Sequence, residues 1–331
     1  MIRTSHYLFA ALCLGSLFAC SRQFTDSYIV PKWCFAVFML FIVLAYEAVN
    51  ILFYRQNEQK DTRISVYGFI IVISCFLQAM FGVVQFFGFF QISTTLWVTG
   101  SFDNPAGFAA CLCAGFPFVG FLLSDSNKYI RYVGGLIGFV IVIAVILSQS
   151  RAGIMSIAFI CFILLNMKFF HKRWVKYLSL LCFALLLSGC YWMKKDSADG
   201  RLLIWRCSVS MVKDAPWLGH GIGSFEARYM DYQADYFRQY GLNRYSMLAD
   251  NVKHPFNEYL GVLLNFGFVG LLMILALITL LIYCYKKHPC AEKRIAFYSL
   301  ISIGVFSFFS YTFTYPFTWI VTFLCIIILT K

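Results

Sequence analysis

The chain has 331 residues, of which 61% are hydrophobic and only 13% are charged, and its formal net charge is +12 at pH 7. A soluble domain is nearer half apolar and a quarter charged. The composition therefore excludes a soluble domain and indicates a polytopic membrane protein.

Apolar runs recur along the chain, and they predict an all-α, polytopic protein with about ten transmembrane helices. Most of the runs are long enough for a helix to cross a hydrocarbon core of roughly 30 Å. The first run and the fifth to seventh are the shortest. The runs cover residues 7–20, 33–53, 65–90, 105–123, 132–147, 153–167, 177–192, 259–285, 295–311 and 317–330.

The first apolar run has an alternative interpretation, because it ends in Leu17-Phe18-Ala19-Cys20. This ending resembles a lipoprotein signal, and a short apolar run is also typical of a cleaved signal peptide. Phe18 fits a lipoprotein signal poorly, and a retained helix gives a consistent topology. We therefore expect the first helix to be kept.

Basic residues in the short connections predict the orientation, because short loops rich in Lys and Arg stay in the cytoplasm. With the N-terminus inside, the short outer connections hold only Arg22, Lys32 and Arg151. Both termini are then cytoplasmic, and the excess positive charge faces anionic lipid headgroups rather than nucleic acid. The inner connections hold Arg55, Lys60, Arg63, Lys128, Arg131, Lys168, Lys172, Arg173, Lys176, Lys286, Lys287, Lys293 and Arg294.

A polar segment, residues 193–258, separates the seventh and eighth runs and is predicted to be one large extracytoplasmic loop. We find no internal repeat, so the simplest organisation is a single membrane domain, 1–331, with this loop as its subdomain. The chain has 13 cysteines, nearly all of them in apolar runs, where Cys behaves as a small hydrophobe. Only Cys207 lies well inside the loop, so no disulfide framework is predicted.

The loop contains two predicted helices. Apolar residues at three- and four-residue spacing predict an amphipathic helix over 201–213 that lies at the membrane surface. Ser224 is predicted to cap a second helix that runs to about Tyr240 and ends at Gly241.

Gly219, Gly221 and Gly223 lie between the two predicted helices. They indicate a tight turn with unusual backbone angles, because a phosphate-binding loop would need a different spacing and a Lys. After the second helix, Pro255 takes the favoured first position of the eighth span. His254 and Asn257 are three residues apart and are expected to share the outer end of that helix.

Several short motifs together resemble the O-antigen ligase and polymerase superfamily. They are Ser150–Gly153, Gly200-Arg201 with Trp205, Pro216–Phe225, and His254–Leu260 followed by Gly267–Gly270, with support from Gly100–Gly107. The resemblance is strongest over 148–271. In one respect the chain differs: the family usually has His directly before the Asn, whereas Phe256 stands there in this chain.

The resemblance implies a metal-independent glycosyltransferase without a cofactor. Such proteins take a glycan from undecaprenyl diphosphate and transfer it at the periplasmic face of the bacterial inner membrane. The acceptor is lipid A-core for a ligase, a growing polysaccharide for a polymerase, or a protein hydroxyl. A lipid-linked glycan transporter or flippase is the alternative from a different class, but transporters usually place polar groups at mid-membrane, whereas these spans are largely apolar.

A diphosphate leaving group needs permanent cations, and Arg offers a planar fork that matches phosphate oxygens. The candidates are Arg151 and Arg201, with Arg206 as a substitute or a structural ion-pair partner. Arg151 opens a span, so a phosphate there would also meet the free amides of a helix N-terminus. The alternative for Arg151 is contact with lipid headgroups.

His254 is the candidate general base for the acceptor hydroxyl, with a structural, helix-capping histidine as the alternative. Glu258 is a candidate orienting partner or second base, although an acidic residue also suits a helix start. The supporting residues are Asn257, Trp205 and His220, the last expected to be structural. No metal site is predicted, because His220, His254 and Cys207 include no closely spaced ligand pair.

Overall fold

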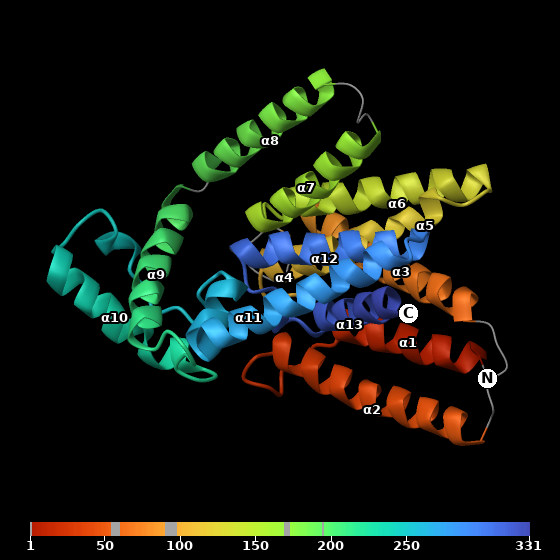
Figure 1. Cartoon of the computed structure of the whole chain (residues 1–331), viewed down its shortest axis with the longest axis horizontal. Coiled ribbons are helices and arrows are strands. Elements are labelled where there is room, and N and C mark those ends of the chain that lie inside the picture. The colour runs from red at the N-terminus through yellow and green to blue at the C-terminus, as the bar shows by residue number, and fades with distance from the viewer. Residues whose placement is uncertain (1, 54–59, 90–97, 169–172, 194) are drawn as a thin grey trace. The chain divides into compact units, whose positions relative to one another are not determined.

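The structure is a computed structural model that describes residues 2–53, 60–89, 98–168, 173–193 and 195–331 (Figure 1). Within these ranges the chain forms helices and no strand, which confirms the predicted all-α class. The α-helices are α1 (Ile2–Phe18), α2 (Ile29–Phe53), α3 (Lys60–Phe86), α4 (Pro105–Gly115), α5 (Val119–Leu123), α6 (Lys128–Leu147), α7 (Arg151–Lys168), α8 (Arg173–Met193), α9 (Lys195–Asp214), α10 (Ser224–Tyr240), α11 (Glu258–Lys287), α12 (Ala291–Phe309) and α13 (Pro316–Thr330). Short 3-10 helices cover Phe116–Phe118, Ser246–Leu248 and Thr312–Thr314.

Each predicted apolar run lies mostly on a helix, the fourth being shared by α4, a 3-10 turn and α5. The end of the third run, residue 90, lies outside the described residues. Within the described ranges, five helical segments are long and apolar enough to cross a membrane. The protein is therefore a multi-pass membrane protein. The count of about ten spans stays a prediction, because α1, α7, α8 and α13 provide shorter apolar segments. The five segments are Ile29–Asn50, Ile64–Phe86, Pro105–Leu123, Lys128–Leu147 and Glu258–Lys287.

The helices form two compact units. The first unit comprises Met1–Ile160, Cys284–Phe306 and Thr312–Lys331, and the second comprises Cys161–Tyr283 and Ser307–Tyr311. The second unit thus contains the predicted polar loop together with α11 as far as Tyr283.

The first unit has α4 as its most buried helix. Residues Gly107 to Gly115 of this helix are all buried, and they are mostly small, which allows neighbouring helices to approach closely. Hydroxyl groups of α12 bond to the backbone of α4: Ser299 donates to the Ala114 carbonyl at 2.7 Å and Ser302 to the Cys113 carbonyl at 2.7 Å. Polar side chains therefore contribute to packing here without being left unsatisfied.

Lys32 was assigned to an outer connection by sequence, but it lies in the first turn of α2 and its side chain is fully buried. Its ammonium group donates to the carbonyl oxygens of Ala19 at 3.1 Å, Tyr28 at 3.2 Å and Ser101 at 2.8 Å. A buried charge is tolerated only when such partners replace water. Lys32 consequently joins α2 to the segment that precedes α4.

In the second unit, α9 packs against α10 (Figure 1). Apolar residues of α9, among them Leu203 and Met211, form a core with Phe225 and Tyr229 of α10. Cys207 belongs to this core, and burial raises the pKa of its thiol to about 11. Such a thiol is a packing group rather than a nucleophile at neutral pH.

Both predicted loop helices are present, with one correction at a cap. The predicted range 201–213 lies within α9, and α10 ends at Gly241, whose φ of 67° confirms it as the stop. Ser224, however, does not cap α10 but is its first residue, and the capping position is Gly223 with a φ of 79°. The left-handed backbone of Gly223 lets the helix start one residue earlier than the Ser-cap pattern suggests.

The start of α11 also differs from the prediction. Pro255 is not in the helix, which begins at Glu258, and the side-chain oxygen of Asn257 accepts a hydrogen bond from the Leu260 amide at 3.0 Å. Phe256 has a φ of 52°, so the backbone cannot continue as a right-handed helix through it. His254 and Asn257 therefore precede α11 and do not share one of its turns.

The predicted tight turn at Gly219, Gly221 and Gly223 is confirmed by φ values of 68°, 90° and 79°. This turn is hydrogen-bonded to α11. The amide of His220 donates to the Leu264 carbonyl at 2.7 Å, and the amide of Gly221 donates to the Asn265 carbonyl at 3.0 Å.

These hydrogen bonds reach α11 just before Gly267, where the helix is interrupted with a φ of 62° and a ψ of −159°. Beyond the interruption, the amides of Phe268 and Val269 donate to the carbonyls of Pro216 at 2.8 Å and Trp217 at 3.2 Å. The loop thus supplies the hydrogen bonds that the interrupted helix cannot make for itself. A Cβ on Gly267 would lie 2.3 Å from the Trp217 carbonyl carbon, so only glycine suits this position.

Candidate active site

Arg201 projects from the second turn of α9 and is held by two groups. Its Nη1 atom donates to the Phe309 carbonyl at 2.6 Å, and its guanidinium carbon lies 5.0 Å from the centroid of the Phe256 ring. A guanidinium over an aromatic face is attracted to the ring electrostatically. These contacts fix the direction of a half-buried, permanently charged cation.

Trp205 lies one turn further along α9 and holds the segment that contains His254. Its indole Nε1 donates to the Pro255 carbonyl at 2.9 Å, although the two residues are 50 positions apart. The Trp205 ring also packs edge-on against Phe308 at 6.0 Å between centroids. Trp205 therefore holds the backbone at Pro255 against α9.

His254 is half-buried, and its ring stacks on Tyr311 with 4.6 Å between centroids and 22° between planes. Burial lowers the pKa of His254 below its ordinary value of 6.5; Lys253 adds to this lowering, whereas Glu226 opposes it. Within the described ranges neither imidazole nitrogen has a hydrogen-bond partner. At neutral pH the ring is consequently in the uncharged form that can accept a proton.

Phe256 connects these two groups. Its ring contacts Tyr311 at 5.3 Å between centroids as well as the Arg201 guanidinium. Arg201 and His254 are therefore brought to one cluster, which is formed by α9, the segment before α11 and the residues that follow α12. We call Arg201, Trp205, His254, Phe256 and Tyr311 the Arg–His cluster.

Asn257 and Glu258 complete the entrance to α11. Asn257 is buried and uses its side-chain oxygen as the helix cap, so its position is explained by local structure. Glu258 is the first residue of the helix, where a carboxylate is stabilised by the helix dipole. It follows the Arg–His cluster directly in sequence.

His220 makes contacts through both ring nitrogens, away from the Arg–His cluster. Its Nε2 atom lies 2.8 Å from the Met211 carbonyl oxygen, and its Nδ1 atom lies 2.9 Å from the guanidinium Nη1 of Arg228. The pattern corresponds to a neutral imidazole that donates to the carbonyl and accepts from the arginine. His220 thereby ties the Gly-rich turn to the end of α9.

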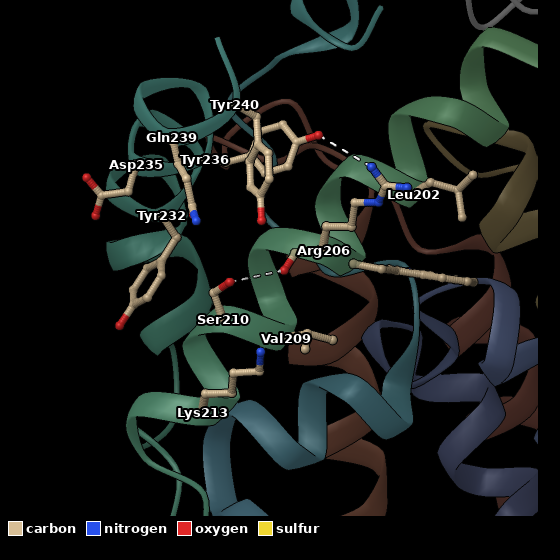
Figure 2. Close-up of a pocket in the computed structure, with 11 residues that line it drawn as sticks. Leu202, Arg206, Val209, Ser210, Lys213, Tyr232, Asp235, Tyr236, Gln239 and Tyr240 are labelled. Carbon is tan, nitrogen blue, oxygen red and sulfur yellow. Dashed lines mark hydrogen bonds between the residues drawn. The ribbon is translucent and has the colours of Figure 1, made fainter. Parts of the chain in front are cut away.

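Arg206, which the sequence grouped with Arg201, has different partners. Its Nη1 atom donates to the Tyr236 hydroxyl at 3.4 Å, and its guanidinium carbon lies 5.1 Å from the Tyr245 ring centroid. Figure 2 shows its side chain on the groove between α9 and α10. Arg206 and Arg201 therefore leave α9 on different faces.

Arg151 belongs to the first unit, where it is the first residue of α7. The turn before it contains Gln149 with a φ of 52°, and the buried Ser150 hydroxyl accepts from the Gly153 amide at 3.4 Å. The helix start predicted at this arginine is therefore present. Its remaining amides and the guanidinium have the chemistry of an anion site.

Tyr311 and Phe309 were missed by the sequence reasoning. Phe309 is the last residue of α12 and Tyr311 follows the helix, and Phe309 is 108 residues from Arg201. No local spacing connects positions so far apart, and the only sequence signal was an aromatic-rich end to the ninth apolar run. As for metals, no group of three or more His, Cys, Asp or Glu side chains suited to an ion occurs in the described ranges.

The fold and this cluster define a multi-pass, all-helical membrane protein with a polar site at one end of α9. Residues 136–275 match the family model described as O-Antigen ligase, which confirms the resemblance seen in the motifs. The family is associated with glycosyltransferase-like ligases. The matched segment contains all of the candidate residues from Arg151 to Glu258. A search of the curated proteins found no match.

Proposed function

We propose that the protein transfers a glycan from undecaprenyl diphosphate to an acceptor hydroxyl at the periplasmic face of the bacterial inner membrane. The observation that carries this proposal is that a fixed arginine and a neutral histidine share the Arg–His cluster inside the segment matched to O-antigen ligases. A ligase acting on lipid A-core, a polysaccharide polymerase and a protein O-oligosaccharyltransferase share this chemistry. They differ in the acceptor.

In the proposed reaction the acceptor oxygen attacks the anomeric carbon of the lipid-linked sugar. His254 takes the hydroxyl proton, a role typically worth about 10²- to 10⁴-fold in rate. The bond between the anomeric carbon and the phosphate oxygen breaks, and its electron pair leaves with undecaprenyl diphosphate. Arg201 neutralises the charge on the leaving group, the role that the sequence also predicts for Arg151, and Glu258 orients the base or serves in its place.

The predicted sidedness supports a periplasmic reaction. Basic residues concentrate in the connections expected to be cytoplasmic, which places the polar loop on the other side. The donor lipid then lies in the outer leaflet beside the site, and the released carrier returns to the same leaflet. Membrane lipids are therefore partners as well as solvent. No step of this reaction requires a metal ion or an organic cofactor.

The test uses the purified full-length protein with undecaprenyl-diphosphate glycan and candidate acceptors. The proposal expects a new glycosidic bond with wild type and loss of transfer in Arg201→Ala and in His254→Ala. Arg131→Ala is the matched control, because Arg131 is exposed on α6 and belongs to neither the Arg–His cluster nor the segments that form it. Full transfer by both site variants would refute the assigned roles. Movement of lipid-linked glycan between leaflets without bond formation would indicate a transporter instead.

A further inference from the structure

A groove between α9 and α10 is lined by Trp205 of the Arg–His cluster and by residues that do not belong to that cluster. It encloses about 640 Å³ and is open to solvent along one side. Figure 2 shows Arg206 and Lys213 on α9 at one wall and Tyr232, Tyr236 and Tyr240 on α10 at the other. A volume of this size is within the roughly 300–1,000 Å³ range of binding pockets for small organic ligands. We call it the α9–α10 groove.

Three tyrosines line the groove. They recur every four residues along α10, so they share one face of the helix. The rings of Tyr236 and Tyr240 are 4.9 Å apart between centroids, and the Tyr232 hydroxyl donates to Asp214, which leaves the Tyr232 ring oriented along the wall. Flat rings with a polar edge can cover the apolar face of a sugar ring while bonding to its hydroxyls.

Positive charge lines the same groove through Arg206 and Lys213. The guanidinium of Arg206 approaches the ring of Tyr245 at 5.1 Å from its centroid, and Arg244, which does not line the groove, approaches the same ring at 4.7 Å. Among the described residues, no carboxylate forms an ion pair with Arg206 or Arg244.

Asp235 is the acidic side chain that lines the groove, and it does not neutralise Arg206 or Lys213. Asp235 is already bound by Arg238 at 2.8 Å. Lys213, which also lines the groove, is exposed and has no ion pair in the described part of the chain. The guanidinium groups of Arg206 and Arg244 repel each other over the Tyr245 ring, and an anion bound beside them would reduce this repulsion. The groove therefore combines rings for stacking with cations for an acidic group.

We propose that the α9–α10 groove binds an acidic glycan, that is, a short sugar segment that carries carboxylate or phosphate groups. The inference rests on the proposed function and adds a class of substrate to it. Tyr236 and Tyr240 stack on sugar faces, Arg206 binds the acidic group, and Ser210 and Gln239 supply further polar contacts from the two walls. The glycan belongs to either the donor or the acceptor, since both present the same chemistry to the groove.

Binding is tested with full-length protein in nanodiscs of uncharged lipid. The probes are a hexasaccharide of alternating glucuronic acid and N-acetylglucosamine and the same hexasaccharide with its carboxyl groups reduced to alcohols. The acidic probe should bind more tightly to wild type. Arg206→Gln should weaken the acidic probe by about 10-fold, as expected for one lost charge-assisted hydrogen bond, and leave the neutral probe unchanged. Tyr236→Ala should weaken both probes.

Arg131→Gln is the matched control, because it removes one exposed arginine outside the groove. Thermal unfolding of each variant checks that it is folded, and Arg206→Lys, which keeps the charge, should retain part of the preference. Equal binding of the two probes to wild type would overturn the proposal. A preference for the acidic probe that remains in the double variant Arg206→Gln with Lys213→Gln would also overturn the proposal.

Two further experiments identify the source of the acidic group, and they distinguish failure of the groove proposal from failure of the proposed function. In the first, transfer is measured with the carboxylates placed on the donor glycan or on the acceptor glycan. The substrate whose KM rises in Arg206→Gln is the one that the groove binds. If anionic phospholipid vesicles compete away the acidic probe and bind through Arg206 more tightly than the probe does, the groove is a headgroup site and the glycan proposal fails. Binding of the acidic probe without any transfer would reject the proposed function alone.

Discussion

The guanidinium of Arg201 lies over the ring of Phe256, which stands directly before the capping residue Asn257. The resemblance noted in the sequence led us to expect His at this position, and the chain places an aromatic face there instead. His254 comes two residues before Phe256 and stacks on Tyr311, which also contacts Phe256. The arginine, the imidazole and the two rings therefore occupy one cluster despite the altered order.

Replacing Arg201 should reduce transfer without unfolding the protein. Arg201→Ala should lower kcat/KM by about 100-fold or more, the size found when one donor to a developing negative charge is removed. Arg201→Lys should recover only part of this, because the ammonium group lacks the planar fork that matches phosphate. Initial rates with undecaprenyl-diphosphate glycan provide the measurement. An unchanged rate in Arg201→Ala would show that the leaving group is bound elsewhere.

Transfer should depend on pH through His254. Burial lowers its pKa below 6.5, so the neutral base is present at pH 7 and is lost as the pH falls through that lowered value. The rate of wild type should therefore be flat near neutrality and decline only in acid. His254→Ala should reduce the rate by about 10²- to 10⁴-fold and remove the acidic limb. Identical pH profiles for wild type and variant would exclude His254 as the base.

The interruption of α11 should tolerate only glycine. Gly267→Ala forces a Cβ to within 2.3 Å of the Trp217 carbonyl carbon at a φ of 62°, and it should destabilise the fold by about 2 kcal/mol or more. Gly261→Ala is the matched control on the same helix, where the nearest atom would be at an ordinary 3.6 Å. Thermal unfolding in detergent compares the two. Equal melting temperatures for Gly267→Ala and Gly261→Ala would contradict the backbone strain expected at residue 267.

The cap of α11 should contribute to stability independently of catalysis. Asn257→Ala removes the acceptor for the Leu260 amide and should cost about 1 kcal/mol, whereas Asn257→Asp retains the acceptor. Chemical denaturation measures the difference. If both variants lost transfer while remaining as stable as wild type, Asn257 would have a direct role in the reaction rather than a structural one.

The helices were largely predictable because apolar runs and helix-breaking residues are local signals. Gly241 ends α10 as expected, and the glycine turn before α10 has the expected left-handed angles. The start of α11 was not predictable from Pro255, since the positive φ of Phe256 accompanies contacts with Arg201 and Tyr311 that come from distant segments. Tertiary contacts there override the local preference of proline for a first helical turn.

The site was predictable in part. Arg201 and His254 were expected on one face of the protein, and the structure places both in the Arg–His cluster. Their aromatic partner Tyr311 could not be found, because it enters from beyond α12. The divergence of Arg206 from Arg201 follows from helix geometry alone: five residues along an α-helix rotate a side chain by roughly 140°. The grouping of the two arginines relied on charge and ignored that rotation.

The hydrogen bonds across the interruption of α11 have a consequence for biogenesis. A helix that enters a bilayer normally satisfies its own backbone, which allows it to be inserted independently. Here the carbonyls of Leu264 and Asn265 and the amide of Phe268 depend on the turn between α9 and α10. The ribosome completes that turn before it synthesises α11, so the nascent chain already holds the partners that the incoming helix requires. We therefore expect insertion of α11 to be coupled to the folding of this turn.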